Sequence, residues 1–88
     1  MFKPVSVLRN LSSDAEIALA KACCANDRKA QFRLFDQYKR TMFGICLRFM
    51  DNRLDAEDLL QEGFVNVFKD ICKFSGKGSL EGWIRTIF

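Results

Sequence analysis

The fold is decided by the stretch Asp55-Ala56-Glu57-Asp58-Leu59-Leu60-Gln61-Glu62-Gly63-Phe64-Val65-Asn66-Val67-Phe68. Its apolar residues recur with the i, i+3, i+4, i+7 spacing of an amphipathic helix. The apolar stripe consists of Ala56, Leu59, Leu60, Gly63, Phe64, Val67, Phe68 and, just beyond, Ile71. Polar side chains lie away from it: Asp55, Asp58, Gln61, Glu62 and Asn66. The pattern predicts a helix with a buried side and an acidic side, and leaves open whether the acids are merely solvated.

Length and composition indicate one small domain, or a piece of a larger protein. Of the 88 residues, 49% are hydrophobic and nine are Phe, which favours a packed core over a disordered chain. No apolar run approaches the roughly 20 residues that span a bilayer. The N-terminus has no sustained apolar run and no small-residue cleavage site, so we expect neither a membrane span nor a signal peptide.

The chain has four cysteines and no histidine. The cysteines are Cys23, Cys24, Cys46 and Cys72. None of them form a C-x-x-C pair, and zinc sites need paired ligands at short spacing, so we expect no metal site and no cofactor. Cys46 and Cys72 fall at or near apolar helix positions, where a reduced cysteine behaves as a small hydrophobe. These features predict a reducing, cytoplasmic environment and no disulfide framework.

Charge is distributed unevenly along the chain, whose net charge is +3. Residues 1–50 carry nine Lys/Arg against four Asp/Glu, and residues 63–88 carry four against two. Between them, residues 51–62 carry one Arg against five acids. An acidic patch bracketed by basic segments suits two partners of opposite character, one of them nucleic acid, and also suits an ordinary mixed surface.

Capping and turn residues divide the chain into helices. Ser13 with Glu16 three residues later forms a capping-box signature, and Asp27 and Ser79 are further N-cap candidates. After an irregular lead at 1–13, we expect helices at roughly 14–25, 28–50, 54–72 and 80–88. Their candidate apolar faces are Ile17, Leu19, Ala22 and Cys23, then Phe32, Phe35, Tyr38, Met42, Ile45, Cys46 and Phe49, and finally Leu80, Trp83, Ile84 and Ile87. The prediction is an all-α bundle of three to four helices over residues 14–88, with its last helix truncated.

The residue types exclude the common catalytic arrangements. Without histidine, neither a serine-centred nor a cysteine-centred triad can be assembled, apart from lysine variants. Gly76-Lys77-Gly78-Ser79 only superficially suggests a P-loop, because a helix precedes it and the spacing is wrong. We therefore expect no catalytic residues and no enzyme.

From Arg28 onward the chain resembles region 2 of bacterial RNA polymerase sigma factors, most closely the extracytoplasmic-function class. The resemblance lies in Asp55-Ala56-Glu57-Asp58-Leu59-Leu60-Gln61-Glu62, which is similar to the family's D-A-E-D-L-[VIL]-Q-E motif. It continues with Phe64, Phe68, Phe74-x-Gly76 and Ser79-Leu80-x-x-Trp83-Ile84 at the expected distances. The resemblance covers roughly residues 14–88, and implies the all-α region 2 fold.

The resemblance implies two binding surfaces. The acidic face would dock on the clamp helices of the largest subunit of core RNA polymerase, through Asp55, Asp58, Gln61 and Glu62. The loop after the helix would capture a base flipped out of the single-stranded −10 promoter element, through Lys73, Phe74, Ser75, Gly76, Lys77, Gly78 and Ser79, with Arg85 meeting phosphate. Phe74 is equally suited to anchor the core, and Trp83 is expected in the core. The residues that complete promoter recognition in the family, and its C-terminal helix-turn-helix domain, lie beyond this sequence.

The function expected is that of a transcription initiation factor fragment, which binds core polymerase and recognises and melts the −10 element. The alternative is a helical protein-interaction module that binds no DNA in this fragment, for example one that docks an anti-sigma protein.

Overall fold

The computed structural model describes residues 12–88, and this part of the chain is helical apart from turns and one loop. Its elements are α2 (Asp14–Cys24), α3 (Arg28–Phe49), α4 (Arg53–Asp70), the short 3-10 helix η1 (Ile71–Lys73) and α5 (Leu80–Ile87). The predicted all-α class is confirmed. Residues 1–11 of the predicted irregular lead lie outside the described residues.

Side-chain caps start the helices at nearly the predicted positions. Ser13 and Glu16 close the capping box of α2, and Asp27 accepts hydrogen bonds from the first backbone N–H groups of α3. Asn52 caps α4 by accepting from the N–H of Asp55, so this helix begins one residue earlier than predicted. Ser79 caps α5 by accepting from the N–H of Gly82. Each cap satisfies a backbone donor that has no partner inside its own helix.

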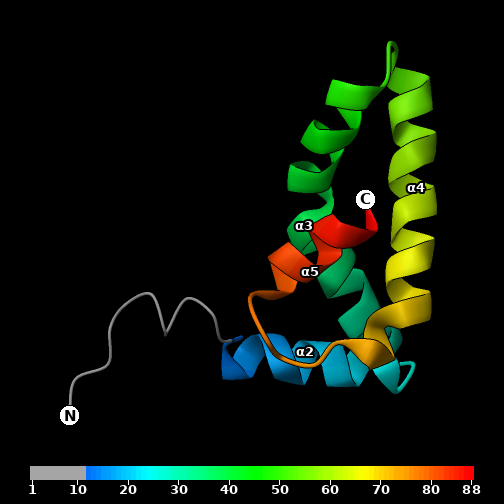
Figure 1. The fold of residues 1–88 in the computed structure, drawn as a ribbon. Helices are drawn as coiled ribbons and strands as arrows, with labels where there is room; N and C mark the ends of the chain where they lie inside the picture. The colour runs from blue at the N-terminus through cyan, green and yellow to red at the C-terminus, as the bar shows by residue number, and fades with distance from the viewer. Residues whose placement is uncertain (1–11) are drawn as a thin grey trace.

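The long helices α3 and α4 run antiparallel as a hairpin, with α2 and η1 at its open end and α5 near its middle (Figure 1). The helix α2 crosses that end, where it packs against α3 and η1. The loop of residues 74–79 then runs along α2 and leads into α5, which packs against α4. This connectivity places the acidic stretch of α4 toward the closed tip of the hairpin and the loop at the other end.

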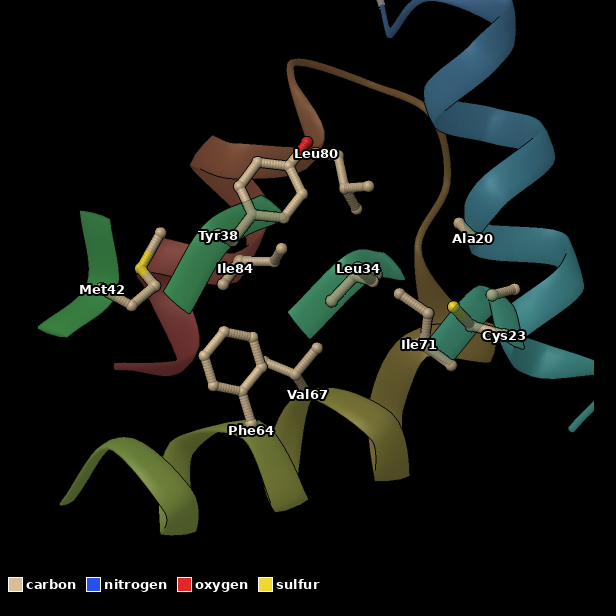
Figure 2. Packing of buried hydrophobic residues seen from close by; sticks show 11 residues of the cluster. Ala20, Cys23, Leu34, Tyr38, Met42, Phe64, Val67, Ile71, Leu80 and Ile84 are labelled. Atoms are coloured by element: carbon tan, nitrogen blue, oxygen red, sulfur yellow. The ribbon is translucent and has the colours of Figure 1, made fainter. Parts of the chain in front are cut away.

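One apolar core joins all the elements. Figure 2 shows its side chains meeting from α2, α3, α4, η1 and α5. Its buried members are Ala20, Cys23, Ala30, Leu34, Tyr38, Met42, Phe64, Val67, Ile71, Leu80 and Ile84. Phe64 is central to the aromatic contacts, with its ring centroid 4.9 Å from that of Phe35 and 5.3 Å from that of Phe88. The predicted stripe of α4 is confirmed, since each of its members is buried or half-buried.

The predicted apolar face of α3 is wrong at two positions. Phe32 is 66% exposed and Phe49 is 74% exposed. Phe32 lies about 120° around the helix from Tyr38, at the edge of the side that packs on α2 and α4. Phe49 lies on the packed side but at the hairpin tip, where α3 ends. The buried side instead follows a four-residue repeat that begins at Ala30 and Leu34.

The prediction of no disulfide is also wrong, because Cys24 and Cys72 form one. Their Cα atoms are 4.9 Å apart although 48 positions separate them in sequence. Cys24 is the last residue of α2 and Cys72 lies in η1, and the packing of α2 on η1 brings the two together. Cys72 is therefore not a buried hydrophobe, and both disulfide cysteines are exposed. Cys23 and Cys46 are free and buried.

Candidate functional site

The acidic face of α4 is exposed along its whole length. Asp55, Asp58, Gln61 and Glu62 all lie at the surface. Within residues 12–88, Asp58, Gln61 and Glu62 take part in no side-chain hydrogen bond or ion pair, so their polar groups face solvent. Asp55 differs, because its carboxylate accepts from the side-chain amide of Asn52 at 2.9 Å and so also supports the start of α4. Unpaired carboxylates beside an amide are suited to charge-assisted hydrogen bonds with Arg or Lys of a partner.

Two apolar side chains extend this face and were missed in the sequence. Leu54 is 73% exposed and Val65 is 56% exposed. With Asp58 and Gln61 they follow a spacing of four, three and four residues, which places all of them on one line along the helix. Single exposed apolar side chains are common on protein surfaces, so these two add apolar contact area to the acidic face without marking an interface by themselves. Both could have been found in the sequence, as apolar residues of this helix that lie outside its predicted apolar stripe.

The acidic helix is fixed to α3 near the hairpin tip. The guanidinium of Arg53 lies 5.6 Å from the ring centroid of Phe43 on α3. The same side chain donates to the carboxylate of Glu57 at 3.3 Å. Glu57 thus points toward the hairpin partner, and the line through Asp58 points away from it. Together with the buried stripe, these contacts give the acidic face one orientation.

The second candidate surface is the loop of residues 74–79. Gly76 and Gly78 have φ angles of 82° and 74°, a conformation that side-chain-bearing residues rarely adopt. The two glycines turn the chain on either side of Lys77, which is exposed. Among the described residues Lys77 has no ion-pair partner. The other basic candidates are paired, since Lys73 contacts Asp70 at 3.5 Å and Arg85 contacts Glu81 at 3.4 Å, both in exposed pairs of small energetic value.

Several loop residues have structural roles as well. The ring of Phe74 is half-buried and lies with its centroid 5.6 Å from that of Trp83, so Phe74 serves as a core anchor. Trp83 packs against the core, as predicted. Ser79 uses its hydroxyl to cap α5. Of the predicted loop residues, the exposed ones without a packing or capping role are Lys73, Ser75 and Lys77. Lys73 is in the ion pair with Asp70, and the Ser75 hydroxyl accepts a long hydrogen bond from the N–H of Lys77 at 3.4 Å.

The start of α2 holds the loop through contacts that sequence reasoning missed. The N–H of Ser12 donates to the carbonyl of Gly76 at 3.1 Å, and its hydroxyl contacts the carbonyl of Gly78. Glu16 bridges two helices with one carboxylate: Oε1 accepts from the N–H of Ser13, and Oε2 accepts from the N–H of Leu80, each at 2.9 Å. The capping box signalled the first of these bonds. The second joins residues 64 positions apart and has no local sequence signal.

The acidic face and the loop are two separate surfaces. Asp58 and Asp70 are twelve residues apart on α4, which corresponds to about 18 Å along the helix axis. The acidic face lies toward the hairpin tip, and the loop lies beside α2 at the opposite end (Figure 1). One partner can therefore bind each surface at the same time.

Residues 12–88 contain neither a cluster of metal-binding side chains nor a helix suited to a membrane. No group of His, Cys, Asp or Glu side chains there could hold a metal ion. None of the helices in that range is both long enough and apolar enough to cross a membrane.

Comparison with known proteins identifies the class that this fold and these surfaces define. The model of the family "Sigma-70 region 2" matches residues 34–88. The chain therefore belongs to the sigma-70 region 2 family, and its resemblance to sigma factors is confirmed.

Among curated relatives, the chain is 34% identical over 64 residues to the ECF RNA polymerase sigma factor SigG of Mycobacterium tuberculosis. That match covers 72% of this chain and 17% of the relative. It is 38% identical over 64 residues to the RNA polymerase sigma factor SigA of Listeria monocytogenes, covering 73% of the chain and 17% of the relative. It is 29% identical over 70 residues to the ECF RNA polymerase sigma-E factor of Haemophilus influenzae. That match covers 80% of this chain and 36% of the relative. The chain thus spans only about a sixth to a third of these relatives. No solved structure gives a significant match.

Proposed function

We propose that the chain is the part of a transcription initiation factor that binds core RNA polymerase and recognises and melts the promoter −10 element. The observation that carries this is the acidic face of α4, which is exposed, unpaired at Asp58 and Glu62 within the described residues, and edged by Leu54 and Val65. The family supports it, since the relatives are named as RNA polymerase sigma factors. Such a factor acts by binding rather than catalysis, and works in the cytoplasm beside its polymerase.

Docking on polymerase is expected to use the α4 face as a rigid unit. The buried stripe and the contact between Arg53 and Phe43 hold the helix before the partner arrives, so little ordering entropy is lost on binding. Basic side chains on the clamp helices of the largest subunit would pair with Asp58 and Glu62. Leu54 and Val65 would supply apolar contact next to those pairs. Asp55 contributes less than its neighbours, because it is already bonded to Asn52.

The loop is expected to bind the unpaired −10 strand. Lys77, which has no ion-pair partner within residues 12–88, offers its ammonium group for a phosphate, and the glycines on either side allow close approach of the backbone. Binding of flipped bases would offset the few kcal/mol that unstacking costs. Phe74 supports this surface from beneath through Trp83, and is not expected to be a free stacking plane.

The docking role is tested by replacing Asp58, Gln61 and Glu62 together with Ala and measuring retention of core polymerase in a pull-down. We expect retention to be lost while the circular dichroism spectrum is unchanged, because the three side chains make no contact that the fold needs. Glu57→Ala is the matched control: it removes an acid from the same helix, on the side that faces Arg53. Full retention by the triple variant would show that polymerase docks elsewhere.

The DNA role is tested in the complex with core polymerase, where the loop is presented to an opened promoter. Lys77→Ala should weaken binding of single-stranded −10 oligonucleotides and reduce the slope of log K against log salt by about 0.7, the value for one phosphate contact on a single strand. Lys29→Ala on α3 is the control for loss of one exposed charge. If the loop variant binds as the parent does while the α4 variant fails on polymerase, the alternative is favoured, namely a helical module that docks a protein such as an anti-sigma factor.

A further inference from the structure

The disulfide between Cys24 and Cys72 lies on the surface and joins the end of α2 to η1, directly before the loop. We propose that these two cysteines are a reversible thiol–disulfide site, which glutathione or a thioredoxin-type dithiol opens, and which controls how firmly α2 holds the loop of residues 74–79. The proposal rests on the proposed function for its biological setting, and on the geometry of the cysteine pair for its chemistry.

The disulfide lies beside a surface hollow from which a reductant can approach. Both cysteines are exposed, and both line a surface hollow of about 210 Å³ together with side chains of α2 and the loop. Lys21 lines the same hollow. Its ammonium group would attract the thiolate of an incoming reductant, and the thiolate is the form that attacks a disulfide.

The setting favours a disulfide that opens and closes. A factor that binds RNA polymerase works in the cytoplasm, where thiols are kept reduced and disulfides are usually transient, catalytic or redox-sensing. A permanent structural disulfide belongs to oxidising compartments. An exposed pair is also more accessible to exchange than a buried one.

The two free cysteines, Cys23 and Cys46, are buried and therefore do not take part in thiol–disulfide exchange with Cys24 and Cys72. Burial raises the pKa of the Cys23 thiol, with a smaller contribution in the same direction from Asp27 and an opposing one from Arg33. Burial also raises the pKa of Cys46. Both thiols therefore stay protonated and enclosed near neutral pH, and exchange is confined to Cys24 and Cys72.

The exchange balances without any other reactant. A reductant thiolate attacks one sulfur, the S–S bond breaks, and the other cysteine leaves as a thiolate that takes up a proton. A second reductant thiol attacks the mixed disulfide, which frees the remaining cysteine and forms the oxidised reductant. Two electrons and two protons thus pass from two reductant thiols to the cysteine pair, and oxidised glutathione reverses the reaction.

Opening the disulfide acts on one end of the loop. In the disulfide-bonded form, the loop region is held near both ends of α2. At the C-terminal end the link is covalent, from Cys24 to Cys72. At the N-terminal end the N–H of Ser12 donates to the carbonyl of Gly76, and the carboxylate of Glu16 accepts from the N–H of Leu80. Cys72 is only two residues before Phe74. Reduction removes the covalent link and leaves the hydrogen bonds, so the chain around Lys73 gains freedom while the entry to α5 stays held.

The chemistry is tested by equilibrating the 88-residue chain in glutathione buffers of varied ratio, then alkylating and locating the labels by mass spectrometry. We expect Cys24 and Cys72 to pass together between labelled and unlabelled states, with Cys23 and Cys46 unlabelled throughout under native conditions. Two results would overturn the proposal: thiols at Cys24 and Cys72 in fully oxidised glutathione, or a disulfide that persists in fully reduced glutathione.

The effect on the loop is tested by the rate of trypsin cleavage after Lys73 or Lys77. We expect the variant Cys24→Ser/Cys72→Ser to be cut about tenfold faster than the disulfide-bonded parent, because local opening exposes this segment. Cys46→Ala, which keeps the disulfide, is the control and should be cut at the parent's rate. The parent reduced by glutathione gives the same comparison without any substitution. Equal rates in the oxidised and reduced forms would overturn the control of the loop.

Neither measurement uses DNA or polymerase. If promoter binding fails while the redox response is present, the proposed function is wrong and the thiol–disulfide site remains. If promoter binding succeeds and the redox response is missing, the proposed function stands and the thiol–disulfide site is wrong.

Discussion

Gly78 in the loop and Gly44 in α3 are expected to have opposite effects on stability when each is replaced by alanine. Gly78 has a φ of 74°, whereas Gly44 lies within α3, and a Cβ added at either would meet no atom within 4 Å. Any difference between alanine substitutions at the two positions therefore comes from the backbone.

We expect Gly78→Ala to lower the free energy of unfolding by about 1–2 kcal/mol, because alanine is strained in the left-handed region. Gly44→Ala should raise it by about 1 kcal/mol, because alanine is the better helix former. Urea unfolding of both variants checks this. A stabilising effect at Gly78 would mean that the loop has a different conformation.

Tyr38 makes stability depend on pH in the alkaline range. Burial raises its pKa above the ordinary value of 10.0, and the carboxylates of Glu16 and Glu81 raise it further. The folded state then holds the phenolic proton more tightly than the unfolded state. The stabilisation is complete below about pH 10 and is lost as the pH rises through the folded pKa.

Tyr38→Phe should therefore flatten the alkaline part of the stability curve. Urea midpoints measured between about pH 8 and 11 for both proteins check this. The buried thiols of Cys23 and Cys46 also have raised pKa values and titrate in both proteins, so their effect cancels in the comparison. Parallel curves would show that Tyr38 ionises as freely in the folded state as in the unfolded state.

At the scale of the elements, α2 connects parts of the fold that are far apart in sequence, because it packs on α3 and η1 and bonds to the start of α5. Glu16 accepts from the first turn of α5 as well as from its own N-cap. We expect Glu16→Ala to lower the free energy of unfolding by about 1–2 kcal/mol, because two backbone donors lose their acceptor. Hydrogen exchange at the amide of Leu80 should quicken in the same variant.

Asp14→Ala is the control, since Asp14 is an acid in the same first turn whose side chain makes no hydrogen bond or ion pair among the described residues. Its loss should affect the helix dipole alone and leave exchange at Leu80 unchanged. An equal effect of both variants would place the role of Glu16 in the dipole rather than in the bridge to α5.

The helices themselves were largely predictable, because their ends carry local signals. Ser13, Asp27 and Ser79 cap as expected, and the starts and ends lie within two residues of the predicted bounds. The face of α3 was harder to predict. Phe32 was placed on the buried side, but the positions of α2 and α4 decide which side is covered, and a helix period does not contain that information. Phe49 is on the covered side but beyond the end of the packing, which a helix period does not show either.

The candidate site was also predictable only in part. The acidic face could be predicted because it is a property of one helix. The hydrogen bond that Leu80 donates to Glu16 and the disulfide between Cys24 and Cys72 could not be predicted, since they join segments 64 and 48 positions apart and depend on how α2 crosses the hairpin. The apolar helix position of Cys72 led to the wrong prediction of no disulfide, because a helix position says nothing about helix ends that meet in space.

For the whole molecule, the disulfide is expected to contribute much of the stability. It closes a loop across 48 positions, and loss of chain entropy in the unfolded state gives about 4 kcal/mol for a loop of that size. Reduction should therefore lower the free energy of unfolding by about 2–4 kcal/mol, with some of the entropic gain lost to residual structure. Urea unfolding with and without a phosphine reductant checks this.

Cys24→Ser provides the matched control, since its stability should equal that of the reduced parent and should not respond to the reductant. Unchanged midpoints for the parent after reduction would mean that the non-covalent contacts of α2 with η1 suffice by themselves.

The shared carboxylate of Glu16 also bears on the order of folding. The hairpin of α3 and α4 joins neighbours in sequence, so it can form early, whereas α5 has eight residues and is too short to persist alone. Besides its cap Ser79, α5 depends on the hydrogen bond that the N–H of Leu80 donates to Glu16 on α2, 64 positions away, and this bond can form only after α2 has crossed the hairpin. Glu16→Ala should then accelerate unfolding and leave the folding rate nearly unchanged, as for contacts made after the transition state. The bridge would act late in folding, as the step that closes the last helix onto the completed bundle.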